Sequence, residues 1–155
     1  MGTDYAEKLI KAAAAACLMV FAGSAAAANI PAGWKSSQRG GMVTYTNTST
    51  GTTFAKFCFN IGNQTKDAWI QSYAQKNNCE NMGKSTAWQT ELQCEVNVNN
   101  RTGVMWVEVQ DERPNPQSIW GYQMTCFKDD PESCGPEFDE IFQPALDANF
   151  NCGRE

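Results

Sequence analysis

The sequence predicts an α+β fold that is mainly β: a curved antiparallel sheet of about five strands with two short helices, stapled by disulfide bonds. Polar and apolar residues alternate regularly over three consecutive segments between Thr86 and Phe127. Two other segments have the apolar spacing of a helix. The number of cysteines is high for a chain of 155 residues and indicates disulfide bonds as part of the framework.

The three alternating segments are expected to form a meander, in which each strand pairs with the next. In 88–98 and 104–110 every second residue is apolar or small, which is the period of a strand with one buried face. Residues 99–103 contain the asparagines and glycine of a short turn. Two prolines in 111–116 end the second strand, and a third alternating strand covers 120–126.

The segments before the meander predict a second hairpin. Residues 42–46 and 52–59 are rich in β-branched and aromatic residues and are separated by the turn residues 47–51. Residues 31–41 have no such pattern and are expected to be a loop.

Two helices are predicted outside the strands. Thr65 can cap a helix over 66–76, because its hydroxyl can accept a hydrogen bond from an open amide of the first turn. Pro136 is suited to the first position of a second helix. Pro144 should end that helix near Gln143 or kink it, because proline has no amide hydrogen to donate.

The first 28 residues resemble a secretory signal peptide. Lys8 and Lys11 precede an apolar or small stretch that ends in Ala26-Ala27-Ala28, and its strongly apolar part is shorter than the ~20 residues of a membrane-spanning helix. We therefore expect 1–28 to be a signal peptide and 29–155 to be one domain, located in the periplasm or secreted, with no membrane span after cleavage.

Disulfide bonds are the expected state of the remaining cysteines, which are Cys58, Cys79, Cys94, Cys126, Cys134 and Cys152. An even number in an exported chain favours pairing, and the absence of histidine and of CxxC spacing argues against a metal site. Cys94 and Cys126 lie two strands apart, roughly 10 Å, which is too far for a disulfide. The preferred pairs are Cys58–Cys79, Cys126–Cys134 and Cys94–Cys152.

Charge and composition exclude several classes of function. The net charge is −5 and no basic cluster is present, so a nucleic-acid partner is not expected. Without histidine or a free thiol, no catalytic residue and no cofactor are predicted. The acidic residues 129–140 are best explained by the preference of carboxylates for a helix N-terminus, although a calcium site is the alternative.

Five tryptophans provide the candidate ligand contacts. Trp69, Trp88 and Trp120 are predicted to be core residues. Trp106 lies on the more polar face of its strand. Trp106 and Trp34 are the two candidate ligand-binding residues. Either the helix 66–76 covers Trp106, which is the preferred interpretation, or that face is open to a ligand.

Several motifs resemble a family of small exported bacterial proteins of unknown function. These are Pro31-Ala32-Gly33-Trp34, Cys58, Cys79, Trp88 followed by Leu92-Gln93-Cys94, and Cys152. Chains of that family begin with Pro-Gly-x-Trp, so Ala32 is an insertion here, and Cys126 and Cys134 are additions. The resemblance implies export and paired cysteines, and it implies no mechanism.

The sequence therefore predicts a non-enzymatic binding module for an unknown protein or a small apolar ligand. One alternative is an enzyme that uses carboxylates, such as a glycosidase with Glu91 and either Glu95 or Glu108. Another is a structural envelope or stress protein. A roomy apolar pocket on the concave face of the sheet would favour binding, and two facing carboxylates in a cleft would favour catalysis.

Overall fold

The computed structural model describes residues 29–110, 117–148 and 152–154. The predicted signal peptide, 1–28, and the predicted strand end at 111–116 lie outside the described residues. Within the described ranges no helix has the length and hydropathy needed to cross a membrane.

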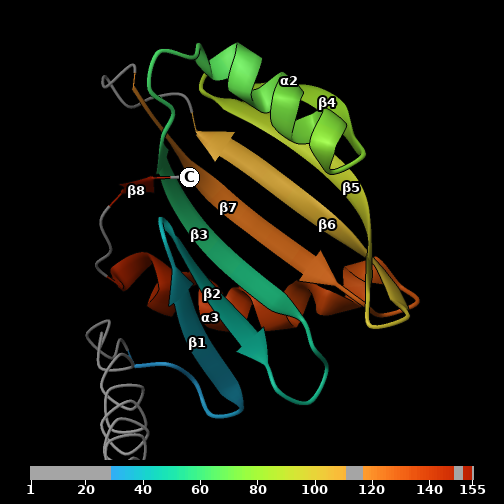
Figure 1. The fold of residues 1–155 in the computed structure, drawn as a ribbon. Coiled ribbons are helices and arrows are strands. Elements are labelled where there is room, and N and C mark those ends of the chain that lie inside the picture. Colours follow the sequence, from blue (N-terminus) through green and yellow to red (C-terminus); the bar gives the residue numbers. More distant parts are fainter. Residues whose placement is uncertain (1–28, 111–116, 149–151, 155) are drawn as a thin grey trace, which may run out of the picture.

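The described residues form one sheet and two α-helices, with the strands bending strongly across the molecule (Figure 1). In chain order the elements are β1 (Trp34–Arg39), β2 (Met42–Asn47), β3 (Thr53–Asn60), α2 (Lys66–Lys76), β4 (Cys79–Thr86), β5 (Gln89–Val98), β6 (Arg101–Gln110), β7 (Ser118–Cys126), the 3₁₀ helix η1 (Pro131–Cys134), α3 (Gly135–Asp147) and β8 (Gly153–Arg154).

Seven antiparallel strands of the described chain follow the spatial order β1-β2-β3-β7-β6-β5-β4, and the short β8 pairs in parallel with β3. The predicted meander is confirmed as β5, β6 and β7, and the predicted hairpin as β2 and β3. β3 of the hairpin pairs with β7 of the meander, and this pairing joins the hairpin and the meander into one sheet.

The prediction of about five strands is wrong because it missed the two edge strands. β1 was expected to be a loop, yet it pairs with β2 along its whole length. Only Trp34 of β1 is buried, and no residue of β4 is buried. Strands that are mostly solvated carry no polar and apolar alternation, so the pattern that revealed the inner strands is absent from both edges.

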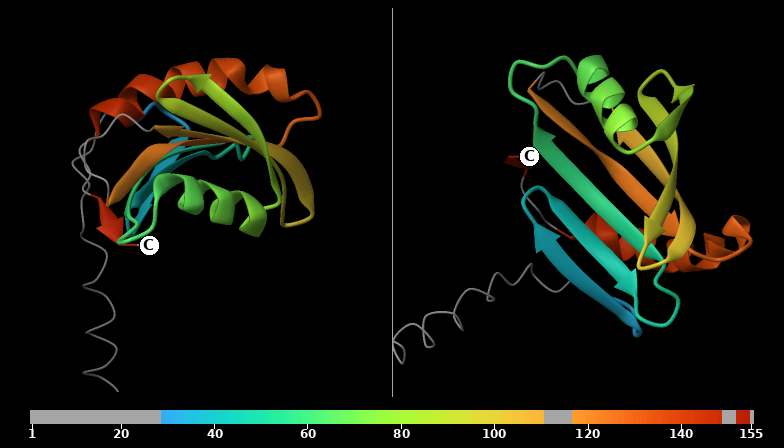
Figure 2. Two further views of the ribbon diagram at one scale, coloured as in Figure 1. Left: turned by 90° about the horizontal axis from the view of Figure 1, so that it is seen from above. Right: turned by 45° about the vertical axis from the view of Figure 1, so that its right-hand side comes forward.

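The helices lie on opposite sides of the sheet, which we call the α2 face and the α3 face (Figure 2). Thr65 caps α2 as predicted, since the Ala68 amide donates to its hydroxyl over 3.1 Å. Trp69 and Ile70 are buried against an apolar cluster that includes Phe57, Phe59, Leu92, Val107 and Ile119. Burial of a large apolar side chain contributes about 1.5 to 3 kcal/mol, so these two residues hold the helix on the sheet.

The α3 face has its own core, which contains Trp34, Val43, Tyr45, Phe54, Tyr122, Ile141 and Ala145. α3 continues through Pro144 to Asp147, so the predicted end near Gln143 is wrong, and the alternative of a kink at Pro144 stays a prediction. Ile141 and Ala145 are fully buried on either side of the proline. Their packing outweighs the hydrogen bond that proline cannot make.

The three predictions about tryptophans in the core have different outcomes. Trp69 is 4% exposed, as predicted, but Trp88 is 59% exposed. Trp88 lies in the two-residue turn between β4 and β5, so the alternation of the following strand does not extend to it. Trp120 is half-buried on the α3 face, where its ring packs edge-on against Tyr122.

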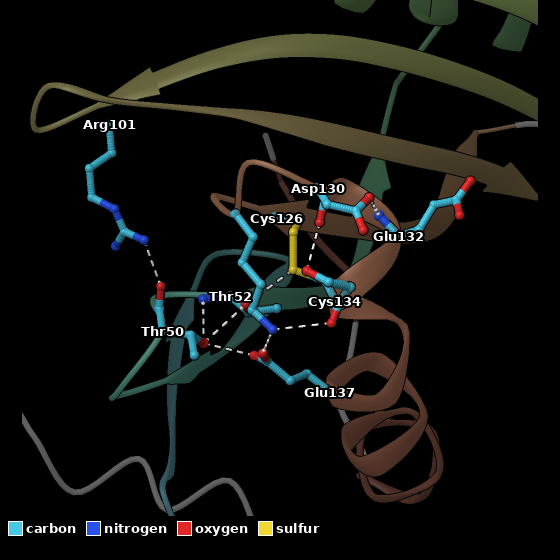
Figure 3. Close-up of a disulfide and its surroundings, with 10 residues drawn as sticks. Thr50, Thr52, Arg101, Cys126, Asp130, Glu132, Cys134 and Glu137 are labelled. Carbon is cyan, nitrogen blue, oxygen red and sulfur yellow. Dashed lines mark hydrogen bonds and ion pairs between the residues drawn. A yellow bond between two sulfur atoms is a disulfide. The ribbon is translucent and has the colours of Figure 1, made fainter.

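The six predicted disulfide cysteines are all paired. Cys126–Cys134 is confirmed (Figure 3). The pairs Cys58–Cys79 and Cys94–Cys152 are wrong. Such bonds persist outside the cytoplasm, so the three disulfides indicate an oxidising, extracytoplasmic environment.

The observed pairing follows from strands that were not predicted. Cys79 begins β4 directly opposite Cys94 of β5, with a Cα–Cα distance of 4.1 Å. Cys152 precedes β8, which pairs with the end of β3 and so brings Cys152 to Cys58, with a Cα–Cα distance of 4.5 Å. One bond therefore fixes an edge strand, and the other fixes the C-terminal segment.

Candidate functional site

A broad hollow, which we call the trough, opens on the α2 face beside α2. The helix forms one wall, and β2, β3, β5, β6 and β7 contribute the rest of the lining. Its wider part has a volume of about 710 Å³, and its apolar lining consists of Met42, Phe59, Trp69, Tyr73, Val96 and Met105. Pockets for small ligands have volumes of roughly 300 to 1,000 Å³ and are lined mainly by such side chains.

Stacked aromatic rings form a fixed wall of the trough. The centroids of Phe57 and Phe59 are 5.4 Å apart, and those of Trp69 and Tyr73 are 5.1 Å apart. Phe59 and Trp69 connect the two pairs at 6.1 Å. Such ring pairs contribute about 0.5 to 1.5 kcal/mol each beyond burial, so the wall is organised before any ligand arrives.

A hydrogen bond joins the helix to the floor of the trough. The side-chain amide of Gln123 on β7 donates to the Tyr73 hydroxyl over 2.6 Å. Tyr73 also contributes its ring to the wall. This contact holds α2 at a fixed height above the open part of the sheet.

A second hollow lies next to the wider part on the same face, toward the turn between β5 and β6, and we call it the outer end of the trough. It has a volume of about 370 Å³ and shares Val96 and Met105 with the wider part. Val98, Phe127 and Arg101 also line it. The outer end is therefore mainly apolar, with a guanidinium group at its edge.

A smaller cleft lies on the α3 face and contains one of the two tryptophans predicted to bind a ligand. Its volume is about 270 Å³, and its lining includes Met82, Glu91, Trp106, Glu108 and Met124. We call it the glutamate cleft. Trp106 is half-buried and meets Phe138 of α3 edge-on, with ring centroids 6.3 Å apart.

The expectation that the helix 66–76 covers Trp106 is wrong, because α2 packs on the opposite face. The alternating directions of side chains along β6 place Met105 and Val107 toward α2, and Trp106 and Glu108 toward α3. Trp106 is covered in part by the N-terminal half of α3 instead.

Two carboxylates face each other in the glutamate cleft, since Glu91 of β5 and Glu108 of β6 are directly opposite in the register. Burial raises the pKa of Glu108, the hydrogen bond from Gln110 opposes this rise, and the charge of Glu91 adds to it. The Gln89 amide also donates to Glu108, over 2.7 Å. Glu95, the other predicted partner of Glu91, is four residues further along β5 and is exposed.

Trp34, the other predicted ligand contact, is 7% exposed. Its indole nitrogen donates to Glu140 of α3 over 3.1 Å, so it fixes the edge strand β1 to the helix. Trp106 lines the glutamate cleft, whereas Trp34 lines neither that cleft nor the trough.

The acidic residues near the start of α3 are distributed over separate contacts. Among the described residues, no group of three histidine, cysteine, aspartate or glutamate side chains is arranged to hold a metal ion. Asp130 accepts the Glu132 amide at the start of η1. Burial tends to raise the pKa of Glu137, but hydrogen bonds from Lys128, Thr50 and Thr52 outweigh it and lower that pKa.

The residues of the trough were not recognised as a site from the sequence. Met42, Val96, Met105 and Gln123 come from four strands, and each has an ordinary place in an alternating pattern. In the sequence, Tyr73 is one aromatic residue of the predicted helix 66–76, and nothing there indicates that its hydroxyl meets Gln123. Only the strand order brings these residues together.

No protein-family model and no curated protein matches this chain. The resemblance to small exported bacterial proteins therefore stays a prediction.

The raised pKa of Glu108 predicts a pH-dependent stability. Because the folded protein favours the protonated acid, stability should fall as pH rises from the ordinary value of 4.5 through the folded pKa. Glu108→Gln should therefore have a larger free energy of unfolding than the wild type at mildly alkaline pH, and the difference should shrink in acid. Urea denaturation across this range measures it.

Glu95→Gln is the matched control, because it removes the same charge from an exposed position of β5. An equal effect of both substitutions at every pH would show that Glu108 has no special electrostatic environment.

Proposed function

We propose that the protein is an exported, non-enzymatic binding module that holds a small apolar ligand in the trough, in the periplasm or outside the cell. The observation that carries this proposal is the aromatic wall of Phe59, Trp69 and Tyr73 beside an open hollow of about 710 Å³. A wall already held by stacking and by the Gln123 hydrogen bond needs no ordering on binding. Preorganisation of this kind lowers the entropic cost of association.

The arrangement of polar groups supports a ligand that is mostly apolar. Gln64, Ser72, Lys76 and Asn77 contribute to the lining from the side of α2. The floor contains Met42 and Met105 as well as Gln123, whose side-chain amide donates to the Tyr73 hydroxyl. Methionine side chains adapt to ligands of different shape. Each methylene group that enters the trough should contribute about 0.8 kcal/mol. Two more carbons in an alkyl chain should therefore tighten binding roughly tenfold.

Filling the trough with an indole should abolish binding. Ser72 is an exposed residue of α2 that lines the trough, and its neighbour Gln71 is an exposed residue that lines a different hollow, between α2 and β4. Ser72→Trp should weaken the binding of 1-octanol at least tenfold by isothermal titration calorimetry, while Gln71→Trp should leave it unchanged. Both variants should melt near the wild type, because neither replaces a core residue.

Failure of the wild type to bind 1-octanol more tightly than 1-hexanol would overturn the proposal. Equal loss of binding in both variants would also contradict it, because the Gln71→Trp indole lies outside the trough. A purely structural role in the envelope would then be the better explanation.

A second function, acid–base catalysis, is favoured by the pairing of Glu91 with Glu108. Retaining glycosidases use two carboxyl groups about 5 to 5.5 Å apart. Glu91 and Glu108 are directly opposite in the register, so their side chains project from neighbouring positions on one face of the sheet. A raised pKa suits Glu108 to the role of general acid, with Glu91 as the second carboxyl group of the pair.

This second function predicts slow hydrolysis of an aryl glycoside that is lost in Glu108→Gln and in Glu91→Gln, and retained in Glu95→Gln. Release of the phenol measures the rate. Hydrolysis that is absent, or that survives both substitutions in the glutamate cleft, would eliminate it.

A further inference from the structure

The outer end of the trough has a cationic side chain, Arg101, at its edge, which indicates the charge of the ligand. We infer that the ligand is an amphipathic carboxylate, with its apolar chain in the trough and its carboxylate on the Arg101 guanidinium. This inference rests on the proposed function, because it names the chemical class of ligand for the same hollow. It adds a polar contact that fixes the direction in which the ligand lies.

Arg101 is placed where an apolar surface ends. It is the first residue of β6 and is exposed, and it lines the outer end beside Val98, which is 50% exposed, and Phe127. The Arg101 guanidinium carbon lies 4.9 Å from the centroid of the Phe127 ring. A chain lying over Val96 and Met105 would therefore reach a cation at the edge of the hollow.

The guanidinium group retains capacity for a ligand. In the part of the chain that the structure describes, Arg101 donates one hydrogen bond, to the Thr50 carbonyl over 2.7 Å (Figure 3). Arginine has five N–H donors in a planar fork that matches both oxygens of a carboxylate. No acidic side chain lines the described outer end, so the lining supplies no competing anion.

Neighbouring contacts hold the guanidinium in position. Thr50 belongs to the turn between β2 and β3, and its hydroxyl donates to Glu137 of α3 over 2.7 Å. Glu137 also forms an ion pair with Lys128. The carbonyl that receives Arg101 is therefore fixed to the start of α3, as Figure 3 shows. The ligand would meet a charge whose side chain is already oriented.

Lys76 is the other cation that lines the trough, at its wider part. It lies in the last turn of α2, where the partial negative charge of the helix end favours a cation. Its ammonium group is also a strongly hydrated point charge without the fork geometry of arginine. The carboxylate is therefore assigned to Arg101.

The test compares sodium octanoate with 1-octanol, which have the same chain length and differ in charge. Isothermal titration calorimetry of the full mature chain at neutral pH should give about fivefold tighter binding for octanoate, as expected for a partly exposed ion pair of up to about 1 kcal/mol. The advantage should fall at high salt, because screening weakens exposed charge pairs.

Arg101→Gln should remove the preference for octanoate while 1-octanol binds as before, which also shows that the variant is folded and its trough intact. Arg101→Lys should keep part of the preference, since it retains the charge and loses the fork. Arg39→Gln, an exposed arginine of β1 outside the trough, is the matched control and should have no effect.

Three results would overturn the inference. Equal affinity of the wild type for octanoate and 1-octanol would show that no cation of the protein binds the carboxylate, although the proposed function would stand. If Lys76→Gln lost the preference for octanoate while Arg101→Gln kept it, the ligand carboxylate would lie on Lys76 and not on Arg101. Failure of both probes to bind would reject the proposed function together with the inference.

Discussion

The constraint from which the open trough follows is that a single short helix covers only part of the α2 face. Seven strands at a spacing of about 4.8 Å make a sheet roughly 29 Å wide. With its side chains a helix such as α2 is only about 10 to 12 Å across. It buries Trp69 and Ile70 against the sheet and leaves Met42 and Val96 partly exposed beside it.

The same argument applies to the α3 face. α3 packs on Tyr45, Phe54 and Tyr122, and its N-terminal half reaches Trp106 through Phe138. The glutamate cleft remains open beyond this contact. Glu108 is therefore only half-buried, and its environment is set by Glu91 and by the glutamine amides beside it.

The disulfides make an incompletely covered sheet compatible with stability. Cys79–Cys94 holds the exposed edge strand β4, which buries no residue of its own. Cys58–Cys152 closes a sequence separation of 94 residues, for which chain entropy in the unfolded state gives on the order of 4 to 5 kcal/mol. Small exported domains use such covalent bonds where a hydrophobic core alone is insufficient.

The inner part of the fold could be predicted because its residues alternate or have helical spacing. Leu92, Val107 and Phe57 are buried on the α2 face, as their patterns indicate. The edge strands could not be predicted, because β1 and β4 bury almost nothing, and the error in β4 led directly to the wrong partner for Cys79.

The candidate site was less predictable than the fold. Trp106 drew attention as a bulky residue on a polar face, and the structure places it in a cleft. The trough depends on which strands are neighbours: Met42 and Gln123 line one hollow only because β3 and β7 pair and so join the two halves of the sheet. Sequence periodicity contains no information on that pairing.

Methionine methyl groups provide the most direct test that the trough is the binding site. Met42 and Met105 line the trough, whereas Met82 and Met124 line the glutamate cleft on the other face. In NMR spectra of protein labelled with carbon-13 at the methionine methyls, 1-octanol should shift the signals of Met42 and Met105 saturably and leave those of Met82 and Met124 in place. Shifts confined to Met82 and Met124, or no shift at any of the four methyl groups, would contradict the assignment of the trough as the binding site.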